Sequence, residues 1–386
     1  MRLSGTENHM RQITFLVIVS VLISCQSKNN DQGSHDVSYS VDTVIIDSKD
    51  RILDINSRLL TSDLNDEESS IFLFNSFDHS IDEVNLDKLA FVNNYSFEAE
   101  GPNGTGEHVN YINLIKEDLI FIKSFGKSAV FDRNGHLIKK IDWLNAIDSK
   151  GMKYGEIPRN EVGIVTSDFK VFGLNYNNAK SEVWLDILSV KDNSIERFDI
   201  DAEKSYHNFV IKIDEPQYYT FLDPIVFLSS ENDFIMVSHQ FSNEIYLFNA
   251  EGEHVKTVNY QPKSTPKRVK DFTRQITSSE QVQEEYQKFL EQVRFGPPIW
   301  DKVKKRYLRL SKSVVFSDLP KEESAFLPET KEENIYLSVF DNDFNLISEI
   351  AIPELSSEYV KYFAKDGKLW VFKNFSDELG FIVVDI

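Results

Sequence analysis

Short apolar and polar runs alternate along this chain, and one such pattern recurs as a predicted β-hairpin. The clearest copy is Phe248–Val258, FNAEGEHVKTV, in which an apolar strand leads into a polar turn at Gly252 and a second strand follows. Further copies begin at Phe74, Phe131, Leu188 and Phe340. From position 74 the copies step by 57, 57, 60 and 92 residues. A repeat of this size, built from strands, predicts a radially repeated β architecture.

The strands between these copies indicate how large each unit is. The third unit reads as four successive strands, which are Val162–Thr166, Lys170–Leu174, Glu182–Val190 and Ile195–Ile200. Four strands are typical of one propeller blade. The body from Val41 to Ile386 holds 346 residues, and a period of about 57 residues gives between five and six units once an insertion of roughly 32 residues is removed. We therefore predict an all-β, six-bladed β-propeller, with seven blades as the alternative.

The last predicted blade is short of one strand. Three strands follow Tyr359 before the sequence ends, whereas Val41–Ile46 and Arg51–Ile55 are strand-like segments without a hairpin copy of their own. An N-terminal strand that completes the last blade would remove the exposed sheet edges of an open array. The sequence thus predicts closure of the ring by one of these two segments.

The longest step between copies contains a helical insert at about 262–300. Ser278 and Gln281 form a capping-box pattern, after which apolar residues recur at helical spacing up to Val293. A shorter helix is predicted to begin at Thr265-Pro266. The span Gln261–Leu310 has 12 Lys or Arg against 6 Asp or Glu. Two interpretations stay open: the insert and the adjacent basic run face a partner, or they pack on the propeller itself.

The N-terminal segment has the features of a bacterial lipoprotein signal. Ile13–Ile23 is a short apolar run behind Arg11, and Leu22-Ile23-Ser24-Cys25 resembles a lipobox. We predict a signal peptide at 1–24, a lipid-modified Cys25, and a flexible polar tether at 25–40 before a propeller domain at 41–386. Met10 would open a conventional signal by itself, so translation could start at Met1 or Met10. The alternative is a noncleaved anchor followed by a buried free cysteine.

Composition narrows the class of protein further. The net charge is −20, which argues against nucleic acid and against anionic membrane surfaces as partners. The single cysteine excludes an intrachain disulfide and cysteine-based zinc sites. The 29 Phe and 15 Tyr residues supply material for a large aromatic core.

No catalytic, cofactor or metal residues are predicted. Two Ser-x-x-Lys matches, Ser124–Lys127 and Ser264–Lys267, are short enough to arise by chance. Asp341–Asn345 resembles a calcium loop but lacks its glycine and its final glutamate, which favours a polar hairpin tip. His239 follows an apolar run and could lie at a strand end, but a structural histidine is the better interpretation.

A resemblance to a known family rests on three features of the sequence. They are the lipobox, the hairpin repeat, and the run Phe295–Asp301 that leads to Arg306-Tyr-Leu-Arg-Leu-Ser311. Together they resemble domain-of-unknown-function family 4221, lipoproteins of Bacteroidetes that are related to six-bladed β-propeller proteins. The resemblance implies a propeller anchored in the cell envelope, most simply in the outer membrane, and carries over one functional residue, the lipidated Cys25. It implies no activity.

Two classes of function follow. The first is a noncatalytic binding or scaffold lipoprotein, which is held to the membrane by its lipid and recognises a protein, peptide or glycan. The second is an envelope hydrolase or lyase with its site in the central propeller channel. The absence of catalytic patterns favours the first.

Overall fold

The computed structural model describes residues 38–115, 118–164, 169–177, 182–200, 206, 210–213, 221–222, 225–270, 275–276 and 278–386. Residues from Val37 to Ile386 belong to one unit. Cys25, the predicted signal peptide and nearly all of the predicted tether lie outside the described residues. These assignments therefore stay predictions.

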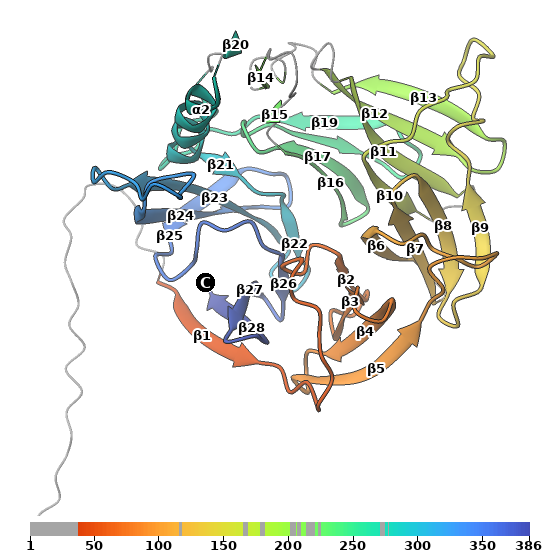
Figure 1. Ribbon diagram of the computed structural model, residues 1–386, viewed down its shortest axis with the longest axis horizontal. Helices are drawn as coiled ribbons and strands as arrows, with labels where there is room; N and C mark the ends of the chain where they lie inside the picture. The colour runs from red at the N-terminus through yellow and green to blue at the C-terminus, as the bar shows by residue number, and fades with distance from the viewer. Residues whose placement is uncertain are drawn as a thin grey trace, which may run out of the picture. The chain divides into compact units, whose positions relative to one another are not determined.

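Six β-sheets, each the equivalent of one propeller blade, are arranged around a common axis (Figure 1). Blade 1 consists of β2 (Ser62–Leu64), β3 (Ser70–Asn75), β4 (Ser80–Asn85) and β5 (Ala90–Ser96). Blade 2 consists of β6 (Val109–Ile115), β7 (Leu119–Ser124), β8 (Lys127–Asp132) and β9 (Leu137–Ile141). Blade 3 consists of β10 (Asn160–Ile164), β11 (Lys170–Asn177), β12 (Glu182–Ser189) and β13 (Ser194–Asp199).

The second half of the chain supplies the other three blades. Blade 4 consists of β16 (Val226–Glu231), β17 (Phe234–His239), β18 (Ile245–Phe248) and β19 (His254–Val258). Blade 5 consists of β21 (Arg294–Phe295), β22 (Ile299–Asp301), β23 (Arg306–Phe316), β24 (Thr330–Phe340) and β25 (Leu346–Ala351), with β21 and β22 both paired to β23. Blade 6 consists of β26 (Tyr362–Lys365), β27 (Lys368–Phe375), β28 (Glu378–Asp385) and β1 (Ser40–Ile45).

The N-terminal strand closes the ring, as predicted. β1 pairs antiparallel with β28 in a register that runs from Ser40 opposite Asp385 to Ile45 opposite Gly380. The other candidate segment, Arg51–Ile55, forms no strand. Closure hides the outer edge of β28, which would otherwise expose a row of unpaired backbone groups.

Most copies of the hairpin repeat are the turns between the third and fourth strands of a blade. In blades 2, 4 and 5 the Asp or Asn after the repeated Phe accepts backbone N–H groups across the turn. Asp132 and Asp341 each accept from the residues two and four positions ahead, and Asn249 accepts from Glu253. This contact explains why Asp or Asn recurs at that position. It also confirms that Asp341–Asn345 is a hairpin tip.

The copy at Phe74 forms a hairpin, as predicted, but it is a different hairpin of its blade from the other copies. Phe74–Val84 spans β3 and β4, the second and third strands of blade 1, one strand earlier than in the other blades. The equivalent hairpin joins β4 to β5, where a register shift falls at Glu83/Val84 as it does at Val130/Phe131 in blade 2. The strands β3 and β4 are both largely buried, whereas β5 is mostly intermediate or exposed, so the apolar pattern of the repeat matches the earlier hairpin in this blade.

The core lies between neighbouring blades and is rich in phenylalanine. The repeated residues Phe131, Phe248 and Phe340 are at most 2% exposed. Fully burying one such side chain stabilises the fold by about 1.5–3 kcal/mol. The hairpin repeat therefore also places one aromatic side chain in the core of each of these three blades.

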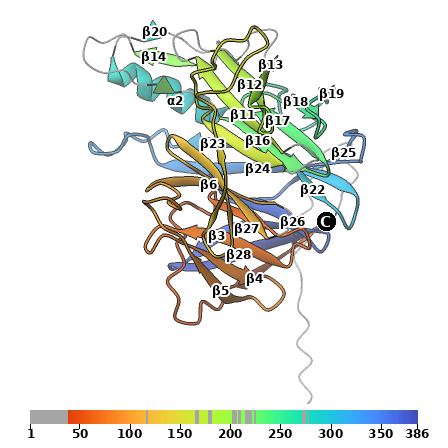
Figure 2. The same cartoon turned by 90° about the vertical axis from the view of Figure 1, so that its right-hand side faces the viewer.

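The longer predicted helix is present as α2 (Ser279–Glu291), which lies beside β14 and β20 (Figure 2). Ser278 is its N-cap and accepts the backbone N–H of Gln281. Val282 and Phe289 are buried in the protein, and the ring of Tyr286 lies 6.0 Å from that of Phe326. The apolar stripe of α2 is thus covered within the chain.

No helix in the described ranges is long and apolar enough to cross a membrane.

The shorter predicted helix is wrong where the structure describes it, because Thr265–Lys270 forms no helix. Its backbone groups bond to a neighbouring segment instead: Val269 N donates to Phe241 O, and Asn243 N donates to Lys267 O. Farther on, β20 (Gln275–Ile276) pairs with β14 (Ile211–Ile213), which also pairs with β15 (Phe221–Leu222). Pairing with distant backbone has replaced the local hydrogen bonds of a helix.

The basic run after the insert makes contacts within the protein. Lys302 lies 3.6 Å from Glu68, Lys304 lies 3.2 Å from Asp385, and Arg306 lies 2.9 Å from Asp301. Arg309 is fully buried and donates to the carbonyls of Gly296, Asn243, His239 and Ser242. These contacts favour the intramolecular interpretation of the basic run.

Candidate functional site

A cavity of about 770 Å³ lies among the inner strands of the blades. Its wall includes residues of β2, β6, β10, β16 and β22 and the segment that leads into β26. The central channel of a propeller is the usual place for a ligand, because the inner strands of all blades present side chains there. The volume falls within the range of small-molecule sites, about 300–1,000 Å³. This cavity is the candidate site.

Five carboxylates line the cavity, and most of them have partners. Asp63 accepts Leu114 N at 2.8 Å and Asn113 Nδ2 at 3.1 Å. Glu161 is paired with Lys123, whose Nζ lies 2.6 Å from its Oε1. Two further carboxylates, Asp66 and Glu68, lie on the turn after β2, and Lys302 reaches both the backbone of Asp66 and the Glu68 carboxylate.

Glu231 differs from Asp63, Glu68 and Glu161, whose carboxylates bond to or pair with other side chains. It ends β16, and its Oε2 accepts the backbone N–H of Trp300 at 3.1 Å. Burial raises the pKa of Glu231 to about 7, because the charged form loses solvation and because Asp63 and Glu68 lie nearby, although Lys361 opposes the shift. In the described part of the chain no ion pair joins Glu231 to a lysine or arginine. The group is therefore a carboxyl that changes charge near neutral pH.

Aromatic side chains form much of the remaining wall. They are Tyr111, Phe227, Trp300, Tyr359, Tyr362 and Phe363. The ring of Trp300 packs on that of Tyr307 with centroids 4.6 Å apart, which fixes its orientation. The cavity thus combines acidic groups with flat apolar surfaces.

Two basic side chains besides Lys302 also line the cavity. Lys361 donates from Nζ to the carbonyl of Ser62 at 3.2 Å. Arg159 lies over the ring of Tyr176 at 4.1 Å, a cation–π contact that directs its charge toward blade 3. Five acidic and three basic side chains leave the cavity net acidic.

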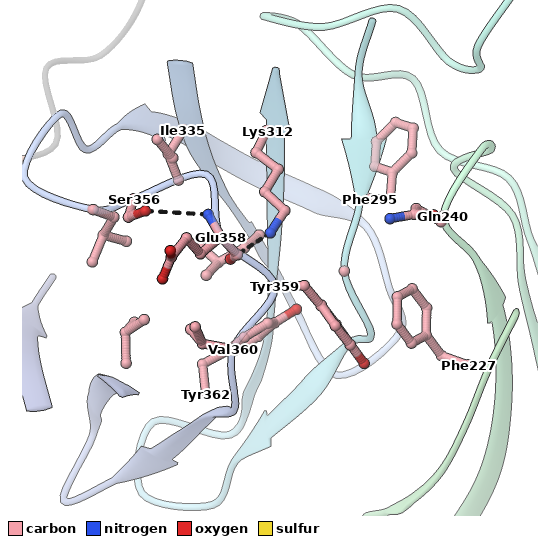
Figure 3. A pocket seen from close by; sticks show the side chains of 14 residues that line it. Phe227, Gln240, Phe295, Lys312, Ile335, Ser356, Glu358, Tyr359, Val360 and Tyr362 are labelled. Carbon is pink, nitrogen blue, oxygen red and sulfur yellow. Dashed lines mark hydrogen bonds between the residues drawn. The ribbon is translucent and has the colours of Figure 1, made fainter. Parts of the chain in front are cut away.

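A much smaller cavity of about 20 Å³ shares Phe227, Tyr359 and Tyr362 with the central one (Figure 3). Lys312 reaches into it and donates from Nζ to the carbonyl of Glu358 at 2.5 Å. Burial lowers the pKa of Lys312 to about 7, with Arg294 adding to the effect. The volume suits one water molecule, so this cavity is not a ligand site.

A groove of about 430 Å³ lies against the connection between β25 and β26. We refer to it as the outer groove. Its wall includes Arg58, Glu358, Lys373 and Asp377. Leu355, Ser356, Glu358 and Val360 line both this groove and the small cavity, and Val360 also lines the central one. The connection between β25 and β26 therefore separates the channel from the outer groove.

None of the residues considered as candidates from the sequence lines the central cavity. His239 is 1% exposed and packs on Phe241, with ring centroids 4.8 Å apart, so it is a core residue. Ser124 donates to Thr105 O, and Lys127 donates to Gly104 O. Ser264 and Lys267 are exposed on the connection before α2. Within the described residues no cluster of ligating side chains could hold a metal ion, and no histidine lines the cavity.

Sequence reasoning missed the residues that do line the cavity. Asp63, Tyr111, Glu231 and Trp300 come from four different blades and share no motif. The available signal was weak: Asp63, Tyr111 and Glu231 lie on or at the end of the first strand of their blades, and Trp300 lies in the run Phe295–Asp301 that carries the family resemblance. Only the assignment of inner strands brings them together.

Fold and cavity define a six-bladed β-propeller whose axis holds a cavity large enough for a ligand. The family model "Domain of unknown function (DUF4221)" matches residues 34–351, and the chain belongs to this family.

Two solved structures share the fold. A DUF4221 member from Bacteroides vulgatus is 12% identical, with a TM-score of 0.61 and coverage of 90% of this chain and 96% of that one. A predicted exported protein from Bacteroides fragilis is 10% identical, with a TM-score of 0.51 and coverage of 92% and 97%. None of the curated proteins matches the chain. Identities this low bear on the fold alone.

Proposed function

We propose that this protein is a lipid-anchored propeller of the bacterial cell envelope that binds a ligand in its central cavity without transforming it. The observation that carries the proposal is the cavity of about 770 Å³. It is concave, it is lined by inner strands of the blades, and it combines aromatic surfaces with a few polar groups. These are the properties of a recognition site. Peptides and glycans fit this mixture, whereas nucleic acid does not fit an acidic cavity in a chain of charge −20.

The anchoring part of the proposal rests on the sequence. Cys25 follows an apolar run and the residues Leu22-Ile23-Ser24, as in a lipoprotein signal. The structural neighbour from Bacteroides fragilis that is described as exported supports a location outside the cytoplasm. Cys25→Ser should abolish incorporation of an alkyne-labelled fatty acid in cells, whereas Ser27→Ala should keep it. Unchanged labelling of Cys25→Ser would contradict the anchor.

Binding is tested by blocking the cavity. Ser230 lines it and is exposed, so Ser230→Trp should fill the channel with little disturbance of the core. Ser324→Trp, on the exposed loop between β23 and β24, is the matched control. A panel of di- and tripeptides, amino-acid amides and oligosaccharides is screened by ligand-observed NMR. Compounds that bind the wild type and Ser324→Trp but not Ser230→Trp support the proposal; a screen in which no compound shows this difference contradicts it.

A second candidate, a hydrolase or lyase with its site in the same channel, has one observation in its favour. Glu231 has a pKa near 7 and lies in the cavity with Lys361, so it could donate or accept a proton at neutral pH. Prolonged incubation of each bound compound with the protein, followed by mass spectrometry, separates the two functions. Recovery of the compound unchanged supports binding, and a product whose formation requires Glu231 supports catalysis.

A further inference from the structure

The charges around Glu231 indicate what kind of group the cavity lacks. Among the acidic groups of the wall, Glu161 is paired with Lys123, Glu68 with Lys302, and Asp63 with donors of β6. Among the described residues, Glu231 accepts a hydrogen bond from the backbone N–H of Trp300, and the Lys361 charge acts on it without forming a close ion pair. A carboxylate in a confined space is stabilised most strongly by a cation in direct contact.

The aromatic residues of the wall suit the same kind of ligand. Trp300, Tyr111 and Tyr362 are part of the cavity that holds Glu231. Tyr111, from blade 2, and Tyr362, at the start of β26, belong to the same wall as Glu231. Ammonium and guanidinium groups bind well where aromatic faces and a carboxylate meet, because the ring faces and the carboxylate all attract positive charge.

Two polar atoms in the wall add to this picture. Asn113 Oδ1 and Ser229 Oγ are buried and have no hydrogen-bond partner within the described residues. Both belong to residues that line the cavity, on β6 and β16. An acceptor without a donor is costly in a buried place. A ligand rich in N–H donors could satisfy such atoms after a small side-chain movement.

We propose, on the basis of the proposed binding function, that the cavity takes a ligand with a primary ammonium or guanidinium group, which pairs with the Glu231 carboxylate between the rings of Trp300 and Tyr111. A peptide with a lysine or arginine side chain is the simplest ligand of this chemistry. The acidic charge of the whole chain would also raise the rate at which such ligands arrive.

The proposal predicts that binding depends on pH. The charged groups that act on Glu231 are Asp63 and Glu68 of blade 1 and Lys361 before β26, and the neutral hydroxyls of Tyr111, Tyr307 and Tyr362 are also coupled to it electrostatically. A cation binds the deprotonated form of Glu231, so affinity should rise with pH. With a pKa of about 7, the deprotonated fraction and hence the affinity should rise about tenfold between pH 6 and pH 8.

The test uses matched probes and variants. N-acetyl-lysine methylamide is compared by calorimetry with its Nε-acetylated form, which is neutral but of similar shape, at pH 6 and pH 8. Glu231→Gln removes the charge while its carbonyl can still accept Trp300 N–H. Glu251→Gln, at an exposed hairpin tip, makes the same change of charge away from the cavity. N-acetyl-arginine methylamide serves as the guanidinium probe.

We expect at least one of the two cationic probes to bind the wild type and Glu251→Gln, with affinity that rises with pH. The neutral probe and the Glu231→Gln variant should each show at least a tenfold loss. Equal binding of neutral and cationic probes, or binding of neither, would overturn the proposal. If other compounds of the panel bind the wild type but not Ser230→Trp, the binding function stands and only the proposed ligand class is wrong. If Ser230→Trp abolishes the binding of no compound, both proposals fail.

Discussion

Lys123 and Glu161 form a buried ion pair that joins blade 2 to blade 3, with Nζ and Oε1 2.6 Å apart and both side chains at most 3% exposed. Trp143 donates its indole N–H to the second carboxylate oxygen at 2.9 Å. The pair thus links β7 to β10 at the wall of the central cavity. Its geometry leads to the first prediction.

Loss of Lys123 alone should destabilise the protein strongly. Lys123→Met leaves the Glu161 charge buried without a cation, which should lower the free energy of unfolding by about 3–5 kcal/mol. The double variant Lys123→Met/Glu161→Gln removes both charges and keeps an acceptor for Trp143. It should regain at least half of the lost stability in urea denaturation. A double variant no more stable than Lys123→Met would show that the ion pair itself is not the source of the loss.

Arg309 should be hard to replace. It donates to four backbone carbonyls and lies 4.8 Å from the centre of the Phe295 ring, all in a fully buried place. Arg309→Met leaves these carbonyls without donors, so we expect a loss of about 3–5 kcal/mol in the free energy of unfolding. Arg309→Lys should lose less unfolding free energy, because lysine keeps the positive charge. Some loss should remain, because lysine lacks the planar fork of donors.

The control for Arg309 is Arg268→Lys, since the Arg268 side chain is exposed. Chemical denaturation should show a change within about 0.5 kcal/mol for it. Comparable losses at the two arginines would contradict the structural role assigned to Arg309.

His239 should make stability depend on pH. Burial and the nearby Arg309 lower its pKa from 6.5 to about 3, so the folded state keeps it neutral. Below pH 6.5 the unfolded state binds a proton that the folded state does not. The free energy of unfolding that neutral His239 contributes is therefore lost as pH falls from about 6.5 toward 3, by about 1.4 kcal/mol per pH unit.

Glu231 has the opposite effect between its unfolded value of 4.5 and its folded value of about 7, because there the folded state binds more protons. The measurement is therefore the difference in unfolding free energy between the wild type and His239→Gln at pH 7.5, 6.5, 5.5 and 5.0. As pH falls, the wild type should lose unfolding free energy relative to His239→Gln. A constant difference would mean that His239 is readily protonated in the folded protein.

Removal of β1 should destabilise blade 6. A chain that starts at Ile46 lacks Ser40–Ile45 and leaves β28 with an unpaired edge. We expect a lower melting temperature and higher oligomers in gel filtration, relative to a chain that starts at Val37. Equal melting temperatures and monomeric behaviour of both chains would contradict the closure by β1.

The sequence predicted the fold well because the repeated hairpin reflects local physics. A buried Phe, a turn held by Asp or Asn, and a buried final Val or Ile recur for reasons that act within eleven residues. Even so, the pattern has limits, because it contains two apolar positions three residues apart. Those at the first position are more than half exposed, namely Ile138, Val255 and Ile347. Those at the second position are buried, namely Ile141, Val258 and Ile350. Periodicity alone could not tell which of the two positions faces the core.

The candidate site could not be predicted in the same way. Glu231 and Trp300 meet through one hydrogen bond across two blades, and nothing near either residue in the sequence marks the contact. The helix expected after Thr265 failed for a similar reason, because the carbonyl of Phe241 and the N–H of Asn243 offered partners that local propensity does not include. Both depend on where distant segments meet after the ring closes.

The pairing of Ser40 with Asp385 has a consequence for how the protein is made. β1 precedes the other described strands of the ring in the sequence and its partner β28 follows them, so blade 6 stays incomplete until the strands of the other five blades have been synthesised. For an exported chain, the same delay applies to passage through the membrane. During that time β1 is a free strand in search of an edge, and contacts so distant in sequence form slowly. The growing chain is therefore open to mispairing of β1 with a neighbour until β28 has emerged.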